Sequence, residues 1–212
     1  MIKNTVIMDT SSSPTKIEFP PEFNVSVPFI DRHLDEGRMD KIIIHTTSGE
    51  KVTYGQLSER VNQSGNVLKN IGLNPGDRIL MVVKDSPEFF YLFWGAIKAG
   101  YIPVPLNTLF RSNDYAHIIE DSDCASVFYS PEFKTEVESA LAQVSRCPNH
   151  SCLTEGVSGN FLEQLQSASL ELDAAPATAT DDCFWLYSSG TTGKPKGVVH
   201  SHRDMVVTSQ HY

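Results

Sequence analysis

The chain has 212 residues, of which 40% are hydrophobic and 20% are charged, an ordinary composition for a globular protein with a sizeable core. Its formal net charge is −9 and no stretch is rich in Lys and Arg, which argues against binding to nucleic acid or to an anionic lipid surface. The longest apolar run, residues 89–97, is too short to span a bilayer, and residues 5–8 are too short for a signal-peptide core, so we expect a cytoplasmic location.

The first residues of the chain mix charged residues, serines and proline, and we expect residues 1–22 to be a disordered tail. Beyond them, Ile30, His33 and Leu34 recur at helical spacing. This spacing predicts a short amphipathic helix that ends at Gly37, because glycine is the residue most often found just past a helix.

Several further helices are predicted from apolar spacing and from start signals. The first opens with a capping box, in which Thr53 and Gln56 stand three residues apart, and it closes before Gly72. The second opens at Ser86, with proline and glutamate in its first turn, and closes before Gly100. Shorter helices are expected at residues 114–120, from residue 131 to residue 141 or 144, and around residues 162–165.

Apolar runs between turn signals predict strands at residues 42–44, 51–53, 79–83, 125–129 and 183–187, with a weak strand near Cys152. Residues 101–106 carry Pro103 and Pro105 and therefore form an irregular or edge strand, because proline cannot donate to a strand ladder. Residues 172–182 form a linker rich in Ala and Thr. Because strands and helices alternate, we predict an α/β fold with layered, largely parallel sheets and helices on both faces.

Residues 188–197 carry the strongest signal for a ligand site and read Ser-Ser-Gly-Thr-Thr-Gly-Lys-Pro-Lys-Gly. Glycine lets a backbone approach a ligand closely, free backbone N–H groups bind anions, and hydroxyls and lysines add donors and charge. We expect the loop at the tip of a hairpin, between strand 183–187 and Val198-Val199, where it suits a polyphosphate. It also leaves the carboxyl end of a strand, where parallel sheets bind their ligands.

The spacing of this loop does not fit the common nucleotide or nucleophile motifs. In a Walker loop that starts at Gly190, Pro195 occupies the position that requires glycine, and no other start fits. A nucleophile elbow needs glycine two residues before the serine, but Leu186 stands two residues before Ser188. A flexible Ser/Gly/Thr turn without a ligand remains the plain alternative for the loop taken alone.

The full string, with Tyr187 before it and His202-Arg203 after it, resembles the phosphate loop of the acyl-adenylate-forming enzymes. That family includes acyl- and aryl-CoA ligases, luciferases and the adenylation domains of peptide synthetases. Further segments resemble the same family from about Phe23 onward: residues 53–57, 75–78, 94–100 and 103–107. The surroundings of the loop, at residues 184–187 and 199–202, look most like the benzoate-type aryl-CoA ligases.

The resemblance implies an enzyme that activates a carboxylic acid, here an aromatic and benzoate-like one, with ATP to acyl-AMP and pyrophosphate. Acyl transfer to coenzyme A would follow. The resemblance also implies that ATP phosphates, with Mg²⁺, are bound by Ser188, Ser189, Gly190, Thr191, Thr192, Gly193, Lys194, Pro195, Lys196 and Gly197. Lys196, Thr191 and Thr192 would act in catalysis, and Lys196 is the stronger candidate of the two lysines because position 194 need not be lysine in the family.

Members of this family are much longer than 212 residues. They continue with an acid-pocket segment, a ribose-binding aspartate and a mobile C-terminal domain that carries a catalytic lysine. We therefore expect residues 23–212 to be an incomplete N-terminal AMP-binding domain, truncated after the phosphate loop and without the C-terminal domain. We also expect this chain alone to be inactive.

Other functions stay open at this point. The chain could be a non-catalytic remnant that binds nucleotide or a protein partner, a phosphotransferase that releases ADP, or an adenylation domain or fatty-acyl-CoA ligase of the same superfamily. His200 and His202 are interpreted as helix-start residues that contact only water. Cys147, His150 and Cys152 lack the spacing of a zinc site, so no metal is expected there.

Overall fold

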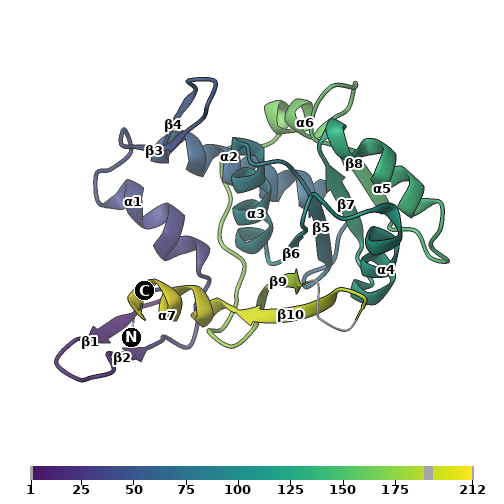
Figure 1. The fold of residues 1–212 in the computed structure, drawn as a ribbon. Helices are drawn as coiled ribbons and strands as arrows, with labels where there is room; N and C mark the ends of the chain where they lie inside the picture. The colour runs from purple at the N-terminus through teal and green to yellow at the C-terminus, as the bar shows by residue number, and fades with distance from the viewer. Residues whose placement is uncertain (1, 189–192, 212) are drawn as a thin grey trace.

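The computed structural model describes residues 2–188 and 193–211 and shows a mixed α/β architecture (Figure 1). Its strands are β1 Ile7–Asp9, β2 Lys16–Glu18, β3 Ile42–His45, β4 Lys51–Thr53, β5 Arg78–Val82, β6 Ile102–Pro105, β7 Ser126–Tyr129, β8 His150–Leu153, β9 Asp182–Ser188 and β10 Lys196–Ser201. Its helices are η1 Val27–Asp31, α1 Arg32–Asp35, α2 Tyr54–Asn70, α3 Pro87–Ala99, α4 Ser112–Ser122, η2 Pro131–Phe133, α5 Lys134–Leu141, α6 Phe161–Ser167 and α7 His202–His211. Within these described residues, no helix has both the length and the apolar character needed to cross a membrane.

A four-stranded parallel sheet with the order β6-β5-β7-β8 forms the centre of the fold. Successive side chains of a strand point to opposite faces. In β5, Ile79 and Met81 pack with α2, α3 and α6, whereas Leu80 and Val82 pack with α4 and α5. Figure 1 shows α2 and α3 on one side of the sheet and α4 and α5 on the other, which confirms the predicted fold class. As its prolines predict, β6 lies at the edge.

The disordered tail predicted for residues 1–22 is not what the structure shows. There β1 pairs with β2 as an antiparallel hairpin, with Ile7 opposite Glu18. At its base the Asn4 N–H donates to the Glu22 carbonyl at 3.1 Å, and the hairpin lies beside α7 from the far end of the chain (Figure 1). The strands are three residues each and mostly exposed, so they leave no apolar periodicity in the sequence to detect.

Helices α2 and α3 pack against each other at very close range. The predicted capping box is present: the Gln56 N–H donates to Thr53 Oγ1 at 3.2 Å, and the Thr53 N–H donates to Gln56 Oε1 at 2.9 Å. A Cβ on Gly95 would lie 2.8 Å from the Val61 carbonyl oxygen, and one on Gly65 would lie 3.0 Å from the Gly95 carbonyl oxygen. Only residues without a side chain permit this approach.

The predicted linker, residues 172–182, is tied to the helices that it crosses. The side-chain amide of Asn66 donates to the Ser169 and Glu171 carbonyls just before it, each at 2.9 Å. Further on, the Ala175 N–H donates to the Lys98 carbonyl at 2.7 Å. These bonds lead the chain across α2 and α3 and into β9.

Candidate functional site

The glycine-rich loop connects β9 and β10, which pair as an antiparallel hairpin, as predicted. This hairpin is a separate two-stranded sheet that lies beside β6 (Figure 1). The loop leaves the carboxyl end of a strand, as expected, but this strand, β9, belongs to the hairpin and not to the four-stranded parallel sheet. The loop is instead held at the end of its own hairpin, next to the sheet.

The last residues of the two strands fix the stem of the loop. Ser188 pairs with Lys196, and Tyr187 pairs with Gly197. The Tyr187 ring lies across the hairpin, so that a Cβ on Gly197 would lie 3.0 Å from Tyr187 Cζ and 3.2 Å from its hydroxyl oxygen. Glycine at position 197 therefore makes room for the ring.

The structure describes the two ends of the predicted site. Ser188, Lys194 and Lys196 are exposed, whereas Pro195 is buried between the two lysines. Gly193 has a φ of +119°, a conformation that favours glycine. The remaining predicted residues, Ser189, Gly190, Thr191 and Thr192, lie outside the described residues, so their assignment to phosphate binding and catalysis stays a prediction.

Two side chains of α4 reach the stem of the loop, and sequence analysis missed both. The Tyr187 hydroxyl donates to Asp121 Oδ2 at 2.6 Å. His117 Nε2 lies 3.1 Å from the carbonyl oxygen of Pro195. The available signal was a pair of titratable residues four apart on a helix of mixed polarity, but nothing local indicates a partner so far along the chain.

These residues surround an open depression of about 600 Å³, lined by His117, Asp121, Lys194, Pro195, Lys196 and Gly197. The two ammonium groups of its lining outnumber its single carboxylate. The lining therefore suits a polar anionic ligand better than an apolar one.

The ionisation of nearby groups supports this arrangement. Burial raises the pKa of Tyr187, and its hydrogen bond to Asp121 adds to the effect, so the phenol keeps its proton and acts as the donor. Hydrogen bonds from Ser145 hold the pKa of Glu120 below its usual value, with a smaller contribution from the positive charge of Lys194. Lys194 is therefore close enough to Glu120 of α4 to favour the ionised form of that carboxyl group.

His200, in β10, and His202, at the start of α7, both contact protein, so the interpretation of water contact alone is wrong. His202 is 4% exposed, its Nδ1 accepts the Val25 N–H at 3.2 Å, and burial lowers its pKa to about 4. The His200 ring stacks on Phe184 with centroids 4.7 Å apart, and its Nδ1 lies 3.6 Å from Asp204 Oδ2. The two residues hold the base of the hairpin to the N-terminal segment and to α7.

The cysteines show no metal-binding arrangement in the described part of the chain, which contains no group of three or more His, Cys, Asp or Glu side chains placed to hold a metal ion. Cys152 is buried and Cys147 is exposed. Burial raises the pKa of Cys152 to about 11, which keeps it a neutral thiol. That the protein binds no zinc remains a prediction.

Comparisons with known proteins identify the family of the chain. A family model described as AMP-binding enzyme matches residues 31–212. A benzoate–CoA ligase from Thauera aromatica is 36% identical over 208 residues, which cover 97% of this chain and 39% of that protein. A crystal structure of an anthranilate–CoA ligase with anthranoyl-AMP has a TM-score of 0.84 at 32% identity and covers 90% of this chain and 37% of that one. ATP-bound MatB from Rhodopseudomonas palustris has a TM-score of 0.75 at 28% identity, with 88% and 36% covered.

The helix-flanked parallel sheet, with the hairpin of β9 and β10 beside it, defines an α/β protein whose candidate site lies at that hairpin. The chain belongs to the AMP-binding enzyme family. Its similarity to the benzoate-type aryl-CoA ligases, predicted from the residues around the loop, is confirmed. The chain spans about two fifths of the length of these relatives, 39% of the Thauera ligase and 37% of the anthranilate ligase.

Proposed function

We propose that this chain forms the phosphate-binding part of an ATP-dependent acid–CoA ligase. The enzyme would convert a benzoate-like aromatic acid and ATP to acyl-AMP and pyrophosphate, and then transfer the acyl group to coenzyme A. The observation that carries the proposal is the loop at 188–197, where two exposed lysines flank Pro195 and where Tyr187 and Pro195 are held by α4. Its aryl-CoA ligase relatives, one of them solved with anthranoyl-AMP, support the aromatic substrate.

The first half of this reaction joins two anions, a carboxylate and the α-phosphate of ATP, and releases a third. Oriented donors and positive charge offset that repulsion only if they are in place before the charge develops. Lys196 pairs with Ser188 at the end of the hairpin, so its backbone is fixed, whereas Lys194 lies farther into the loop. We therefore assign the larger share of phosphate charge stabilisation to Lys196, with the glycine-rich backbone and the Ser and Thr hydroxyls as donors.

Mg²⁺ would accompany the triphosphate, because magnesium binds phosphate oxygens and water with one or two carboxylates rather than in an all-protein cage. The carboxylate at the depression, Asp121, already accepts the Tyr187 hydroxyl. The described residues offer no cluster of three metal-ligating side chains. The described residues therefore do not by themselves fit a protein-held metal site.

We assign only the phosphate end of the site to residues 188–197. The acid, ribose, adenine and coenzyme A contacts are not assigned to described residues, because the match covers about two fifths of the relatives. In this proposal residues 23–212 correspond to the first part of a larger N-terminal AMP-binding domain.

The test is thioester formation by the polypeptide translated from the whole reading frame, supplied with ATP, Mg²⁺ and coenzyme A. Benzoate, hydroxybenzoates and anthranilate are compared with medium-chain fatty acids. We expect aromatic acids to give the higher kcat/KM. Preference for the fatty acids would move the protein to the fatty-acyl ligases of the same family, and no acid-dependent turnover would favour a non-catalytic binding module.

A further inference from the structure

One face of α4 contacts both ends of the glycine-rich loop. Asp121 binds Tyr187, which stands immediately before the loop, and His117 binds Pro195, near its end. Side chains four residues apart lie on the same face of a helix. A single rigid element therefore sets the separation of the loop ends, in addition to the pairing of β9 with β10.

The contact at the start of the loop is short and directional. The Tyr187 hydroxyl lies 2.6 Å from Asp121 Oδ2, a distance typical of a hydrogen bond to an ionised acceptor, which is about twice as strong as a neutral one. Tyr187 is only 9% exposed, and its ring packs across the stem against Gly197. Asp121 thus holds the ring that fixes the first residue of the loop relative to the last.

The contact at the end of the loop determines which ring nitrogen of His117 carries the donated hydrogen. A carbonyl oxygen only accepts, so the hydrogen in the bond to Pro195 must reside on His117 Nε2. Pro195 is buried and its ring fixes φ, which leaves its ψ and the following peptide as the main freedom. By holding that carbonyl, His117 sets the path of the backbone between Lys194 and Lys196.

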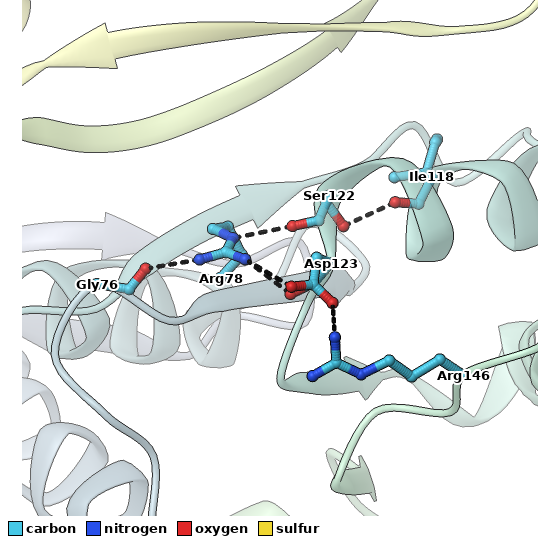
Figure 2. Close-up of polar contacts among 6 residues, drawn as sticks. All are labelled: Gly76, Arg78, Ile118, Ser122, Asp123 and Arg146. Atoms are coloured by element: carbon cyan, nitrogen blue, oxygen red, sulfur yellow. Dashed lines mark hydrogen bonds and ion pairs between the residues drawn. The ribbon is translucent and has the colours of Figure 1, made fainter.

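The helix that supplies both contacts is itself anchored (Figure 2). Arg78 Nε donates to the Ser122 carbonyl at 2.9 Å, and its terminal nitrogens donate to the carbonyls of Asp123 at 2.8 Å and Gly76 at 3.2 Å. The first two carbonyls lie at the C-terminal end of α4, where a helix has no partners of its own for them. Arg146 binds the Asp123 carboxylate at 2.6 Å from the outside.

The same guanidinium also reaches the hairpin. Arg78 lies 5.9 Å from the centroid of the Trp185 ring in β9, within the range of a cation–π contact. One arginine at the start of β5 therefore connects the sheet, the end of α4 and the strand that leads into the loop.

We propose that His117 and Asp121 are positioning residues for the phosphate loop. They hold Tyr187 and Pro195, so that the neighbouring Ser188, Lys194 and Lys196 are in place before a polyphosphate binds. Donors that are fixed in advance cost no reorganisation when charge develops in the reaction. The inference rests on the function proposed above, and it assigns the two α4 side chains to the nucleotide half-reaction, without direct contact to the reacting atoms.

The first experiment measures backbone hydrogen exchange in the chain without nucleotide. It compares His117→Ala, His117→Gln and Asp121→Ala with Asn113→Ala, an exposed position on the same helix. In His117→Ala and Asp121→Ala, the backbone amides of peptides that span residues 188–201 should exchange about fivefold faster or more, while those of β5 keep their protection. Asn113→Ala should exchange like the unaltered protein. His117→Gln, whose amide can still donate, should restore most of the protection. Unchanged exchange in the loop, or acceleration spread evenly over the chain, would overturn the proposal.

The second experiment uses the polypeptide translated from the whole reading frame. His117→Ala should lower kcat/KM for ATP in ATP–pyrophosphate exchange by about 10- to 100-fold, the cost of a misplaced catalytic group, while thioester formation from supplied acyl-AMP changes by less than about twofold. Equal losses in both half-reactions would contradict a positioning role. Absence of exchange in the unaltered protein would defeat the proposed function instead, and the hydrogen-exchange result would still decide the role of α4.

Discussion

His202 should make the stability of the fold depend on pH. Its pKa is about 4 in the folded protein against an ordinary value of 6.5, because burial disfavours the charged ring; the nearby Asp181 opposes this only in part. Between these two values the unfolded chain binds a proton that the folded chain does not. The contribution of His202 to the free energy of unfolding is therefore fully present above pH 6.5 and is lost as the pH falls toward 4.

The size of the effect follows from the difference between the two pKa values. At 1.36 kcal/mol per unit, the complete loss is roughly 3 kcal/mol, and about 2 kcal/mol of it falls between pH 7 and pH 5. The neutral ring is also required by its partner, since Nδ1 accepts the Val25 N–H and cannot do so when protonated.

Urea unfolding at pH 7 and pH 5 measures this loss in the unaltered protein and in His202→Asn. The asparagine carbonyl can accept the Val25 N–H near the position of Nδ1, but it does not titrate. The variant should therefore lose about 2 kcal/mol less between the two pH values than the unaltered protein. Burial also lowers the pKa of His33 and His150, but these act in both proteins and cancel in the comparison. Equal losses in the two proteins would refute the reasoning.

Three further predictions concern the loop and the core. Lys196→Ala should slow adenylation by about one to three orders of magnitude in half-reaction assays, while thioester formation from acyl-AMP keeps its rate. An equal loss of rate in both half-reactions would exclude a role of Lys196 at the phosphates. Gly197→Ala should cost about 1–3 kcal/mol in urea unfolding, because its Cβ would press on the Tyr187 ring at 3.0 Å, and combination with Tyr187→Ala should remove that penalty. Asp31→Ala should lower the free energy of unfolding by about 3 kcal/mol, because Lys98 is 3% exposed and pairs with Asp31 at 2.7 Å. The double variant Asp31→Leu/Lys98→Met should recover most of this loss. Unchanged stability of Asp31→Ala would contradict the pairing.

The parts of the fold that sequence predicts are those with local causes. Thr53 and Gln56 satisfy each other's backbone donors within one turn, so the start of α2 can be read directly. Gly100 ends α3 in a left-handed conformation that few other residues adopt. Pro103 and Pro105 place β6 at a sheet edge because they lack the donors of a central strand. The hairpin that carries the glycine-rich loop belongs to this group, because apolar residues precede and follow the loop, whereas phosphate binding by the loop stays a prediction.

The parts that escaped prediction depend on partners distant in the chain. His202 is buried because the backbone at Val25 folds over it, and no pattern near residue 202 indicates that contact. His117 and Asp121 meet Pro195 and Tyr187 only once α4 and the hairpin are packed together. The hairpin of β1 and β2 pairs locally, but its short, mostly exposed strands carry no periodicity from which to predict it.

The most direct test of acyl-adenylate formation traces the carboxylate oxygen of the acid with ¹⁸O. The polypeptide translated from the whole reading frame is incubated with ATP, Mg²⁺, coenzyme A and benzoate labelled with ¹⁸O in its carboxyl group, and the products are examined by ³¹P NMR. If the loop serves acyl-adenylate formation, the carboxylate oxygen that attacks the α-phosphate remains with it, and the AMP released by the thiol carries one ¹⁸O while pyrophosphate carries none. Label in inorganic phosphate with formation of ADP, or unlabelled AMP, would contradict the assignment.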